Sequence, residues 1–259
     1  MILNLDGHNF VGQPSSCAGR ASEHLQWNPS CSTLNVGTVH VDACMWKNPL
    51  PGPAPHYAWL LESPATTGEY ERLVEQGAHK RFAKVFTHST RLVQIVPNAA
   101  WVPASGVWVQ DMQMHHKTKM CSMITSPKAF LPGHQRRLLW ADRLKDKVDV
   151  FGLVSRIPRK EEGLCPYRFS VAIENAVAPG YFTEKILDCF ATGTIPVYLG
   201  APDIGVFFNP AGILQLESIR DWARLTPELY ERMLPAVQDN FDRVQRFKVP
   251  EDQLVRYIL

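Results

Sequence analysis

The stretch IENAVAPGYFTEKILDCFATGTIPVYLG, residues 173–200, places a group of polar residues between two apolar segments. The run before it, residues 168–173, is typical of a buried strand. Residues 181–193 follow with helical spacing, and Thr183 is a suitable N-cap. Residues 194–200 read as the next buried strand. This strand, helix, strand order predicts an α/β unit with a mainly parallel sheet.

The same alternation of elements extends on both sides of this stretch. The apolar run at 57–64 predicts a buried strand that ends in a loop, and residues 66–78 predict a helix. Residues 82–89 and 91–97 have the apolar and β-branched content of two further strands. The fold class that we expect is therefore α/β throughout.

The repeated pattern predicts two successive domains. Residues 1–112 form an N-terminal α/β domain, and residues 113–235 form a second one. A helical segment, 236–259, completes the chain. We expect the two sheets to face each other across a cleft.

Charge and hydropathy exclude some classes of function. Lys and Arg number 27 against 25 Asp and Glu, a net charge of +2 that gives no reason to expect a nucleic-acid or anionic-membrane partner. No signal-peptide pattern and no transmembrane segment is evident. We expect a cytoplasmic protein, or the soluble catalytic domain of a longer membrane-anchored one.

Six cysteines occur, and none forms a Cys-x-x-Cys pair. A zinc site is therefore not predicted, and free thiols are favoured over disulfides in a chain large enough to build its own core. No convincing metal motif is present, so we expect no residue of the chain to act as a metal ligand.

The polar group in the opening stretch lies where α/β proteins bind ligands, beyond the carboxyl end of a strand and at the start of a helix. Main-chain N–H groups there favour anions, and Lys185 adds a positive charge. Glu184 could accept hydrogen bonds from sugar hydroxyls. The alternative is a simple capping arrangement with an exposed charge pair. Spacing alone favours that alternative.

The sequence of residues 167–210, YRFSVAIENAVAPGYFTEKILDCFATGTIPVYLGAPDIGVFFNP, resembles the C-terminal motif of the family 10 α1,3/4-fucosyltransferases. That motif has a Glu-Asn turn, Tyr-x-Thr-Glu-Lys and a Pro-Val strand ending in Gly. The segment from Lys119 to Gly152 and the Trp-Leu-Leu-Glu-Ser-Pro at 59–64 are also similar to family patterns. Arg168 and Ile173 depart from it.

The resemblance implies a GT-B-type fold of two Rossmann-like domains, with GDP-fucose as the donor and a glycan as the acceptor. It implies that Glu62 is the catalytic base. The implied donor-binding residues are Arg137, Glu174, Asn175, Tyr181, Glu184 and Lys185. Arg137 fits the family spacing better than Arg136, and Glu174 has an alternative role as a structural acid for the loop that carries Tyr181.

The expected reaction is a single displacement with inversion. Arg137 and Lys185 stabilise the charge that develops on the diphosphate, and Glu62 takes the proton of the acceptor hydroxyl. No metal cofactor is required, and a divalent ion is at most stimulatory. Two alternatives remain open: transfer from another GDP-sugar, and an inactive nucleotide-sugar or glycan-binding module. His88 and His134 receive no role from the sequence.

Overall fold

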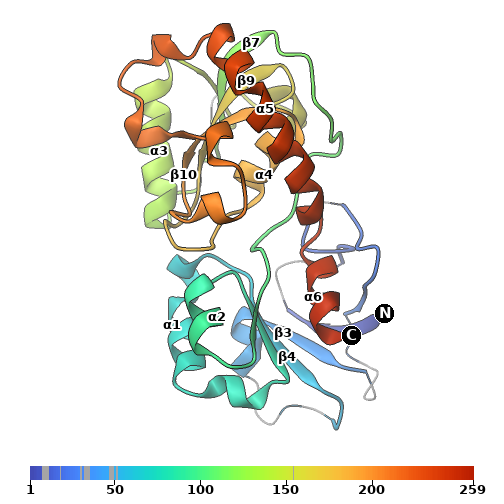
Figure 1. The fold of residues 1–259 in the computed structure, drawn as a ribbon. Coiled ribbons are helices and arrows are strands. Elements are labelled where there is room, and N and C mark those ends of the chain that lie inside the picture. The colour runs from blue at the N-terminus through green and yellow to red at the C-terminus, as the bar shows by residue number, and fades with distance from the viewer. Residues whose placement is uncertain are drawn as a thin grey trace. The chain divides into compact units, whose positions relative to one another are not determined.

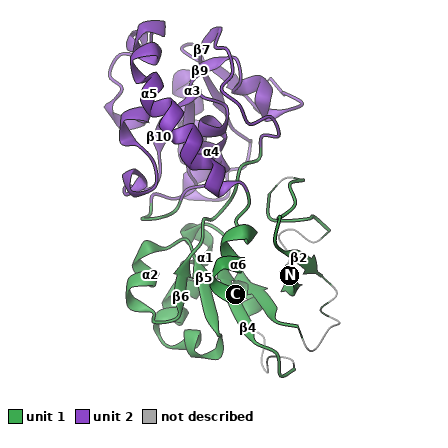
Figure 2. Ribbon diagram, turned by 45° about the vertical axis from the view of Figure 1, so that its right-hand side comes forward, with its two compact units in different colours: residues 1–108, 178–181, 249–259 green, residues 109–177, 182–248 purple. Residues whose placement is uncertain are grey.

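The computed structural model describes residues 1–7, 12–17, 19–29, 31, 36–46, 50, 52–153 and 155–259. They form two compact units, coloured separately in Figure 2. Unit 1 comprises Met1–Trp108, Ala178–Tyr181 and Val249–Leu259. Unit 2 comprises Val109–Val177 and Phe182–Lys248.

Unit 1 is built on a six-stranded sheet in the order β2-β1-β3-β4-β5-β6, in which every described pairing is parallel. Its strands are β1 Ile2–Asp6, β2 Gln26–Asn28, β3 Thr38–Val41, β4 His56–Leu60, β5 Lys84–Thr87 and β6 Ala99–Trp101. Its α-helices are α1 Pro64–Glu75, α2 Thr90–Ile95 and α6 Glu251–Ile258.

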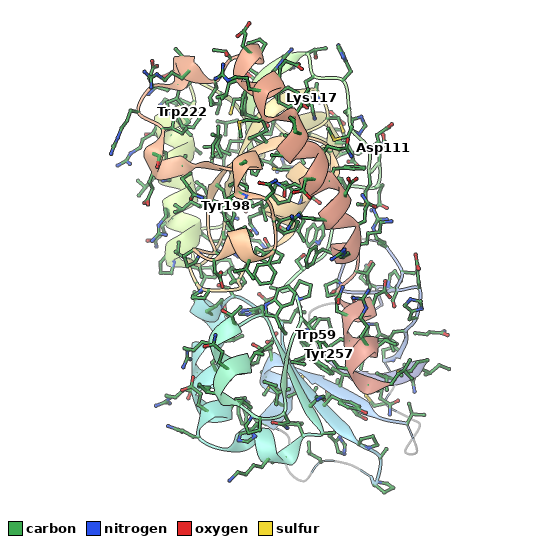
Figure 3. The ribbon with its side chains drawn as sticks, viewed as in Figure 1. Trp59, Asp111, Lys117, Tyr198, Trp222 and Tyr257 are labelled. Atoms are coloured by element: carbon green, nitrogen blue, oxygen red, sulfur yellow. The ribbon has the colours of Figure 1, made fainter. Side chains whose placement is uncertain are left out.

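Strand β4 shows how this sheet is buried on both faces. Tyr57 and Trp59 pack in one core cluster, which also contains Leu254 and Val255 of α6. Ala58 and Leu60 pack in another cluster with residues of α1 and α2. Successive side chains of a strand point to opposite faces, so α6 covers one face and α1 and α2 the other. Trp59 and Tyr257 are labelled in Figure 3.

A buried carboxylate joins α6 to the N-terminal part of unit 1. Glu251 Oε1 accepts hydrogen bonds from the main-chain N–H of Ser16 at 2.6 Å and from Trp27 Nε1 at 3.3 Å. Its Oε2 accepts one from Ser16 Oγ at 3.1 Å. A buried charge is stable only when it is well bonded, so these contacts explain why the end of the chain belongs to unit 1.

Unit 2 is built on a five-stranded sheet in the order β11-β10-β9-β7-β8, with parallel pairing throughout its described strands (Figure 1). Its strands are β7 Lys119–Ile124, β8 Asp149–Phe151, β9 Tyr167–Ile173, β10 Ile195–Leu199 and β11 Leu214–Gln215. Its α-helices are α3 Pro132–Leu144, α4 Glu184–Ala191 and α5 Pro227–Val244.

The elements predicted from the opening stretch are confirmed as β9, α4 and β10. The Thr183 hydroxyl accepts a hydrogen bond from the N–H of Lys185 as the N-cap of α4. At the other end of α4, the buried ammonium of Lys117 donates to Thr192 O at 2.7 Å and to Thr194 Oγ1 at 2.8 Å (Figure 3). These hydrogen bonds satisfy main-chain and side-chain oxygens at the C-terminal end, so α4 is capped at both ends.

Two expectations differ from the structure. Residues 91–97 are not a strand, because α2 spans Thr90–Ile95 and Ser89 Oγ caps it by accepting from Leu92 N–H at 3.3 Å. The strand is β6, which comes after it. The predicted boundaries at 112 and 235 also differ from the structure. Along the chain, unit 1 changes to unit 2 after Trp108, and residue 235 lies inside α5. The predicted segment 236–259 is divided between unit 2 and unit 1.

All six cysteines lie among the described residues, and each has a free thiol, as predicted. No helix in the described part of the chain has both the length and the apolar composition needed to cross a membrane.

Candidate active site

The order of the strands in unit 2 defines a topological switch point. From β7 the chain passes through α3 to β8 on one side of the sheet order, and from β9 it passes through α4 to β10 on the other. The order therefore reverses between β7 and β9. In open α/β sheets, ligands bind at this switch point, beyond the carboxyl ends of the strands. Helices α3 and α4 both begin there.

The first turn of α3 lies directly against the end of β9. A Cβ atom at Gly133 would stand 1.9 Å from the carbonyl oxygen of Asn175, so only glycine fits. The same helix carries Arg137 one turn later, 7% exposed, whereas the neighbouring Arg136 is exposed. The assignment of Arg137 rather than Arg136 to the diphosphate stays a prediction.

The N-terminus of α3 has the features of an anion site. The N-cap residue, Leu131, provides no side-chain hydrogen bond, and the first turn contains no acidic residue. The partial positive charge of the helix N-terminus therefore adds to that of Arg137.

The start of α4 is organised by Glu174, which is buried at the end of β9. Glu174 Oε1 accepts from the main-chain N–H of Thr183 at 2.9 Å, and Oε2 accepts from the Thr183 hydroxyl at 2.6 Å. Burial raises the pKa of Glu174, against the lowering effect of Lys185. These contacts hold the N-cap residue of α4. The choice between a structural role and donor binding for Glu174 stays a prediction.

Lys185 and Glu184 form a charged network at the same helix end. Lys185 Nζ donates to Thr183 Oγ1 at 2.9 Å and to Glu184 Oε1 at 3.1 Å, and it lies 3.6 Å from Glu174 Oε2. Burial alone would raise the pKa of Glu184, but the ammonium groups of Lys185 and Lys160 lower it to about 2. Glu184 is therefore ionised at neutral pH.

Lys160 is a member of this network that sequence reasoning missed. Its Nζ lies 2.8 Å from Asp188 Oδ2 and 3.9 Å from Glu184 Oε1. Asp188 is buried, and its other oxygen accepts from the N–H of Val109 at 3.1 Å. Lys160 lies in a short 3₁₀ helix, Lys160–Gly163, and no spacing pattern connects it to α4.

His134 is a further buried residue of α3. It is buried in the first turn of α3, and the ring of Phe130 contacts it edge-on with centroids 4.5 Å apart. Burial lowers its pKa, and the positive charges of Arg137, Lys128 and Lys185 lower it further.

Glu62 belongs to unit 1 and follows the carboxyl end of β4. Its side chain is exposed, and its main chain is held on both sides. Asp42 Oδ1 accepts from the N–H groups of Leu61 and Glu62, at 3.0 and 3.4 Å. The Glu62 carbonyl accepts from His88 Nε2 at 3.0 Å and from Thr67 Oγ1 at 3.3 Å. This is the strand-end position expected for the base.

Tyr181 also belongs to unit 1, with the rest of Ala178–Tyr181. It is buried, and its ring packs edge-on against the ring of His88 with centroids 5.0 Å apart. The structure therefore divides the predicted residues into two sets. Unit 2 holds Arg137, Glu174, Asn175, Glu184 and Lys185, and unit 1 holds Glu62 and Tyr181.

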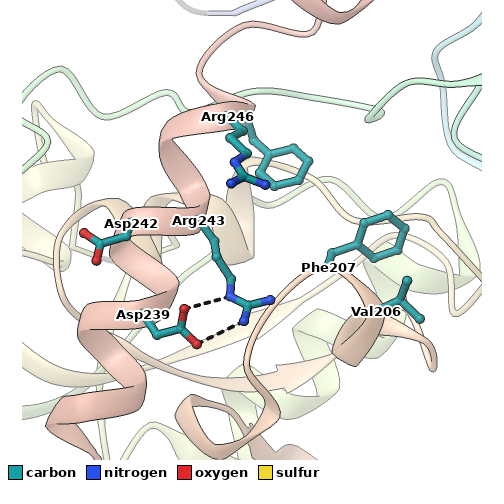
Figure 4. Close-up of a pocket in the computed structure, with 7 residues that line it drawn as sticks. Val206, Phe207, Asp239, Asp242, Arg243 and Arg246 are labelled. Carbon is teal, nitrogen blue, oxygen red and sulfur yellow. Dashed lines mark hydrogen bonds and ion pairs between the residues drawn. The ribbon is translucent and has the colours of Figure 1, made fainter.

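A pocket of about 530 Å³ lies elsewhere in unit 2, beside the C-terminal half of α5 (Figure 4). Arg243 is paired there with Asp239, at 2.9 and 3.2 Å. None of the predicted site residues lines it. The lining residues are Val206, Phe207, Asp239, Asp242, Arg243, Arg246 and Phe247.

In the described residues, no group of three or more His, Cys, Asp and Glu side chains is arranged to hold a metal ion.

Comparison with known proteins identifies the class of protein. The model of the C-terminal region of glycosyltransferase family 10 (fucosyltransferase) matches residues 114–249, more than half of the 259 residues. The chain belongs to this family.

Two curated relatives match shorter segments. The α-(1,3)-fucosyltransferase FucT of Helicobacter pylori is 35% identical over 66 residues, which are 26% of this chain and 14% of that protein. The GDP-fucose protein O-fucosyltransferase 3 of Danio rerio is 49% identical over 41 residues, 16% of this chain and 9% of that protein. The matched segments thus span a small part of each relative.

A solved structure supports the fold over nearly the whole chain. The crystal structure of an α1,3-fucosyltransferase with GDP superposes with a TM-score of 0.55, covering 95% of this chain and 88% of that one at 15% identity. Two parallel-sheet α/β units with this likeness define the GT-B fold, as predicted.

Proposed function

We propose that this chain transfers L-fucose from GDP-fucose to a hydroxyl group of a glycan, with inversion at the anomeric carbon. Membership of family 10 supports a fucosyltransferase. The observation that carries the assignment of the donor is the arrangement at the switch point of the unit 2 sheet. Helix α3, which carries Arg137, begins against the main chain of Asn175. The adjacent Glu174 holds Thr183, the N-cap of the helix that carries Lys185. A guanidinium one turn into a helix that has no side-chain cap, together with a lysine in the first turn of the next helix, suits a diphosphate.

In this proposal, the chemistry of unit 2 is electrostatic. As the bond between fucose and the diphosphate breaks, negative charge grows on the leaving phosphate oxygens. The planar guanidinium of Arg137 suits two parallel hydrogen bonds to them, and Lys185 acts as a point charge. Fixed positive charges that need no rearrangement stabilise the transition state more than water does. Glu174 and Thr183 hold the end of α4 that carries Lys185.

Unit 1 supplies the base. The Glu62 carboxylate is exposed beyond β4, where it can take the proton of the attacking hydroxyl. A positioned base of this kind contributes about 10² to 10⁴-fold to a rate. We further propose that the chain needs no metal, because Arg137 and Lys185 take the role of a divalent ion at the phosphates. The proposed acceptor is a glycan hydroxyl of unspecified linkage. The two curated relatives differ in this respect, because one is named for an α-(1,3) linkage and the other for transfer to protein.

The test is turnover of labelled GDP-fucose by the chain and by Glu62→Gln. We expect release of GDP and labelled glycan with the chain. We expect the variant to bind GDP with unchanged affinity but to transfer about 100-fold more slowly. Faster turnover of GDP-mannose would instead favour another GDP-sugar, and tight GDP binding without any turnover would favour an inactive binding module.

A further inference from the structure

His88 is buried at the end of β5, and all of its described contacts are with unit 1. Its exposed fraction is 0%. Its Nε2 lies 3.0 Å from the carbonyl oxygen of Glu62. A carbonyl oxygen can only accept, so Nε2 carries the proton. Nδ1 is then an acceptor, and it is buried with no hydrogen-bond partner in the described residues.

The same residue also holds the segment Ala178–Tyr181. The Tyr181 ring packs edge-on against the imidazole. Gly180 has a φ of 74° and lies so close to the His88 carbonyl that a Cβ would stand 2.2 Å from the oxygen. That carbonyl also accepts from Trp101 Nε1 at 2.9 Å. The imidazole of His88 thus contacts Glu62 and Tyr181, and its carbonyl lies against Gly180.

These two segments matter for the proposed reaction. One carries Glu62, the base. The other is the part of the chain between Asn175, at the end of β9, and Thr183, which caps α4. Within unit 1, His88 therefore contacts both the residue proposed as the base and the segment Ala178–Tyr181.

The main chain around Glu62 is otherwise held by Asp42. Asp42 has a φ of 49°, in the left-handed region, and is buried. Strained residues of this kind persist where the surrounding structure holds them, and they often mark functional sites. Asp42 binds the N–H side of Leu61 and Glu62, and His88 binds the carbonyl side of Glu62. Together they fix the peptide planes on either side of the Glu62 Cα atom, and so the direction of its side chain.

We propose that His88 is a positioning residue for fucosyl transfer: its Nε2–H fixes the Glu62 main chain while its ring and carbonyl anchor Ala178–Tyr181. This inference rests on the proposed function, in which Glu62 is the base. In this role, His88 acts through Glu62 and Ala178–Tyr181 rather than on a reacting atom. Burial lowers the pKa of His88 to about 4, which keeps the ring neutral at physiological pH.

Two amide variants separate positioning from packing. The side-chain nitrogen of glutamine occupies the place of histidine Nε2, and that of asparagine the place of Nδ1. His88→Gln should therefore keep the hydrogen bond to Glu62, and His88→Asn should lose it. We expect kcat to fall about 10 to 100-fold in His88→Asn and to stay within about threefold of the parent in His88→Gln, since small misplacements of a reacting group cost up to about 100-fold.

The control measurements exclude a general loss of folding. GDP affinity should change less than about twofold in both variants, because the phosphate-binding cations belong to unit 2. His79→Gln is the matched control, because His79 lies in the same unit, where its Nδ1 is 3.0 Å from Asn98 Oδ1. Parent-like kcat in His88→Asn, an equal loss in both amide variants, or a parallel loss of GDP affinity would overturn the proposal.

A second readout keeps this inference distinct from the proposed function. If the parent chain does not turn over GDP-fucose, the proposed function fails, and hydrogen exchange then tests the positioning role alone. We expect faster amide exchange at 60–63 and 178–181 in His88→Asn than in His88→Gln, since exchange reports local opening. Identical exchange in the two variants would refute the role of His88.

Discussion

The carboxylate of Glu174 accepts two hydrogen bonds from Thr183, one from the main-chain N–H at 2.9 Å and one from the hydroxyl at 2.6 Å. Both residues are buried. This pairing joins the end of β9 to the start of α4 and satisfies one of the four main-chain N–H groups that a helix start leaves open. Because the Thr183 hydroxyl also accepts from Lys185, the acid fixes the position of that lysine indirectly.

Glu174→Gln should therefore lower the free energy of unfolding by about 1 to 3 kcal/mol, because the charge-assisted bonds to Thr183 are weakened in a buried place. Chemical denaturation measures this. Glu217→Gln, at an exposed acid of the same unit, should change stability by less than about 0.5 kcal/mol. Unchanged stability together with a large loss of GDP-fucose affinity would instead indicate that Glu174 contacts the donor.

Arg137→Ala and Lys185→Ala should each weaken GDP binding by about 1.5 to 3 kcal/mol, the usual range for a hydrogen bond to a charged group. Titration calorimetry gives the dissociation constants. The matched control is Arg136→Ala, which removes the same charge from the exposed side of α3 and should leave the affinity almost unchanged. Equal effects at 136 and 137 would mean that only the total charge matters.

Removal of divalent metal should leave transfer intact. In the proposed site, Arg137 and Lys185 supply the positive charge that faces the diphosphate, so EDTA should change kcat by less than about twofold. A radiometric assay before and after dialysis against EDTA tests this. Loss of activity that added Mn²⁺ or Mg²⁺ restores would show that the phosphates are bound through an ion.

The depressed pKa of His88 has a consequence for stability. Its value is about 4 in the folded chain, because of burial, against an ordinary value of 6.5. Between these values the unfolded chain binds more protons, so the free energy of unfolding falls as the pH is lowered from about 6.5 to 4. A shift of this size corresponds to at most about 3 kcal/mol.

Urea denaturation of the parent and of His88→Gln across this range isolates the effect of the histidine. The glutamine cannot titrate, so its curve should slope less with pH, and the two curves should run parallel above about pH 6.5. Parallel curves over the whole range would show that the pKa of His88 is the same in the folded and the unfolded chain.

Local signals in the sequence were sufficient for the central elements of unit 2. The apolar run of β9, the capping threonine of α4 and the apolar run of β10 lie within a short continuous stretch, so period and capping rules apply directly. The helix α2 could not be found in this way. It has only six residues, and of these only Leu92 is buried, so no helical period is visible and the β-branched residues suggested a strand.

The candidate site was predictable only in part, because its remaining members are distant in the sequence. Arg137 and Lys185 come from elements on opposite sides of the switch point, and the family pattern was needed to connect them. Lys160 and His88 carry no such pattern. Their positions follow from tertiary contacts with Asp188 and with the Glu62 carbonyl. The return of the chain to unit 1 at Val249 was missed for the same reason.

The anchoring of α6 by Glu251 affects the order in which the parts can be completed on the ribosome. Unit 2 ends at Lys248, so all of its residues are synthesised before the last helix of unit 1. Until then, the sheet that is synthesised first has one face without α6, and the apolar side chains on that face are open to water or to other chains. On the ribosome, unit 1 is therefore the first unit to begin synthesis and the last to complete its fold.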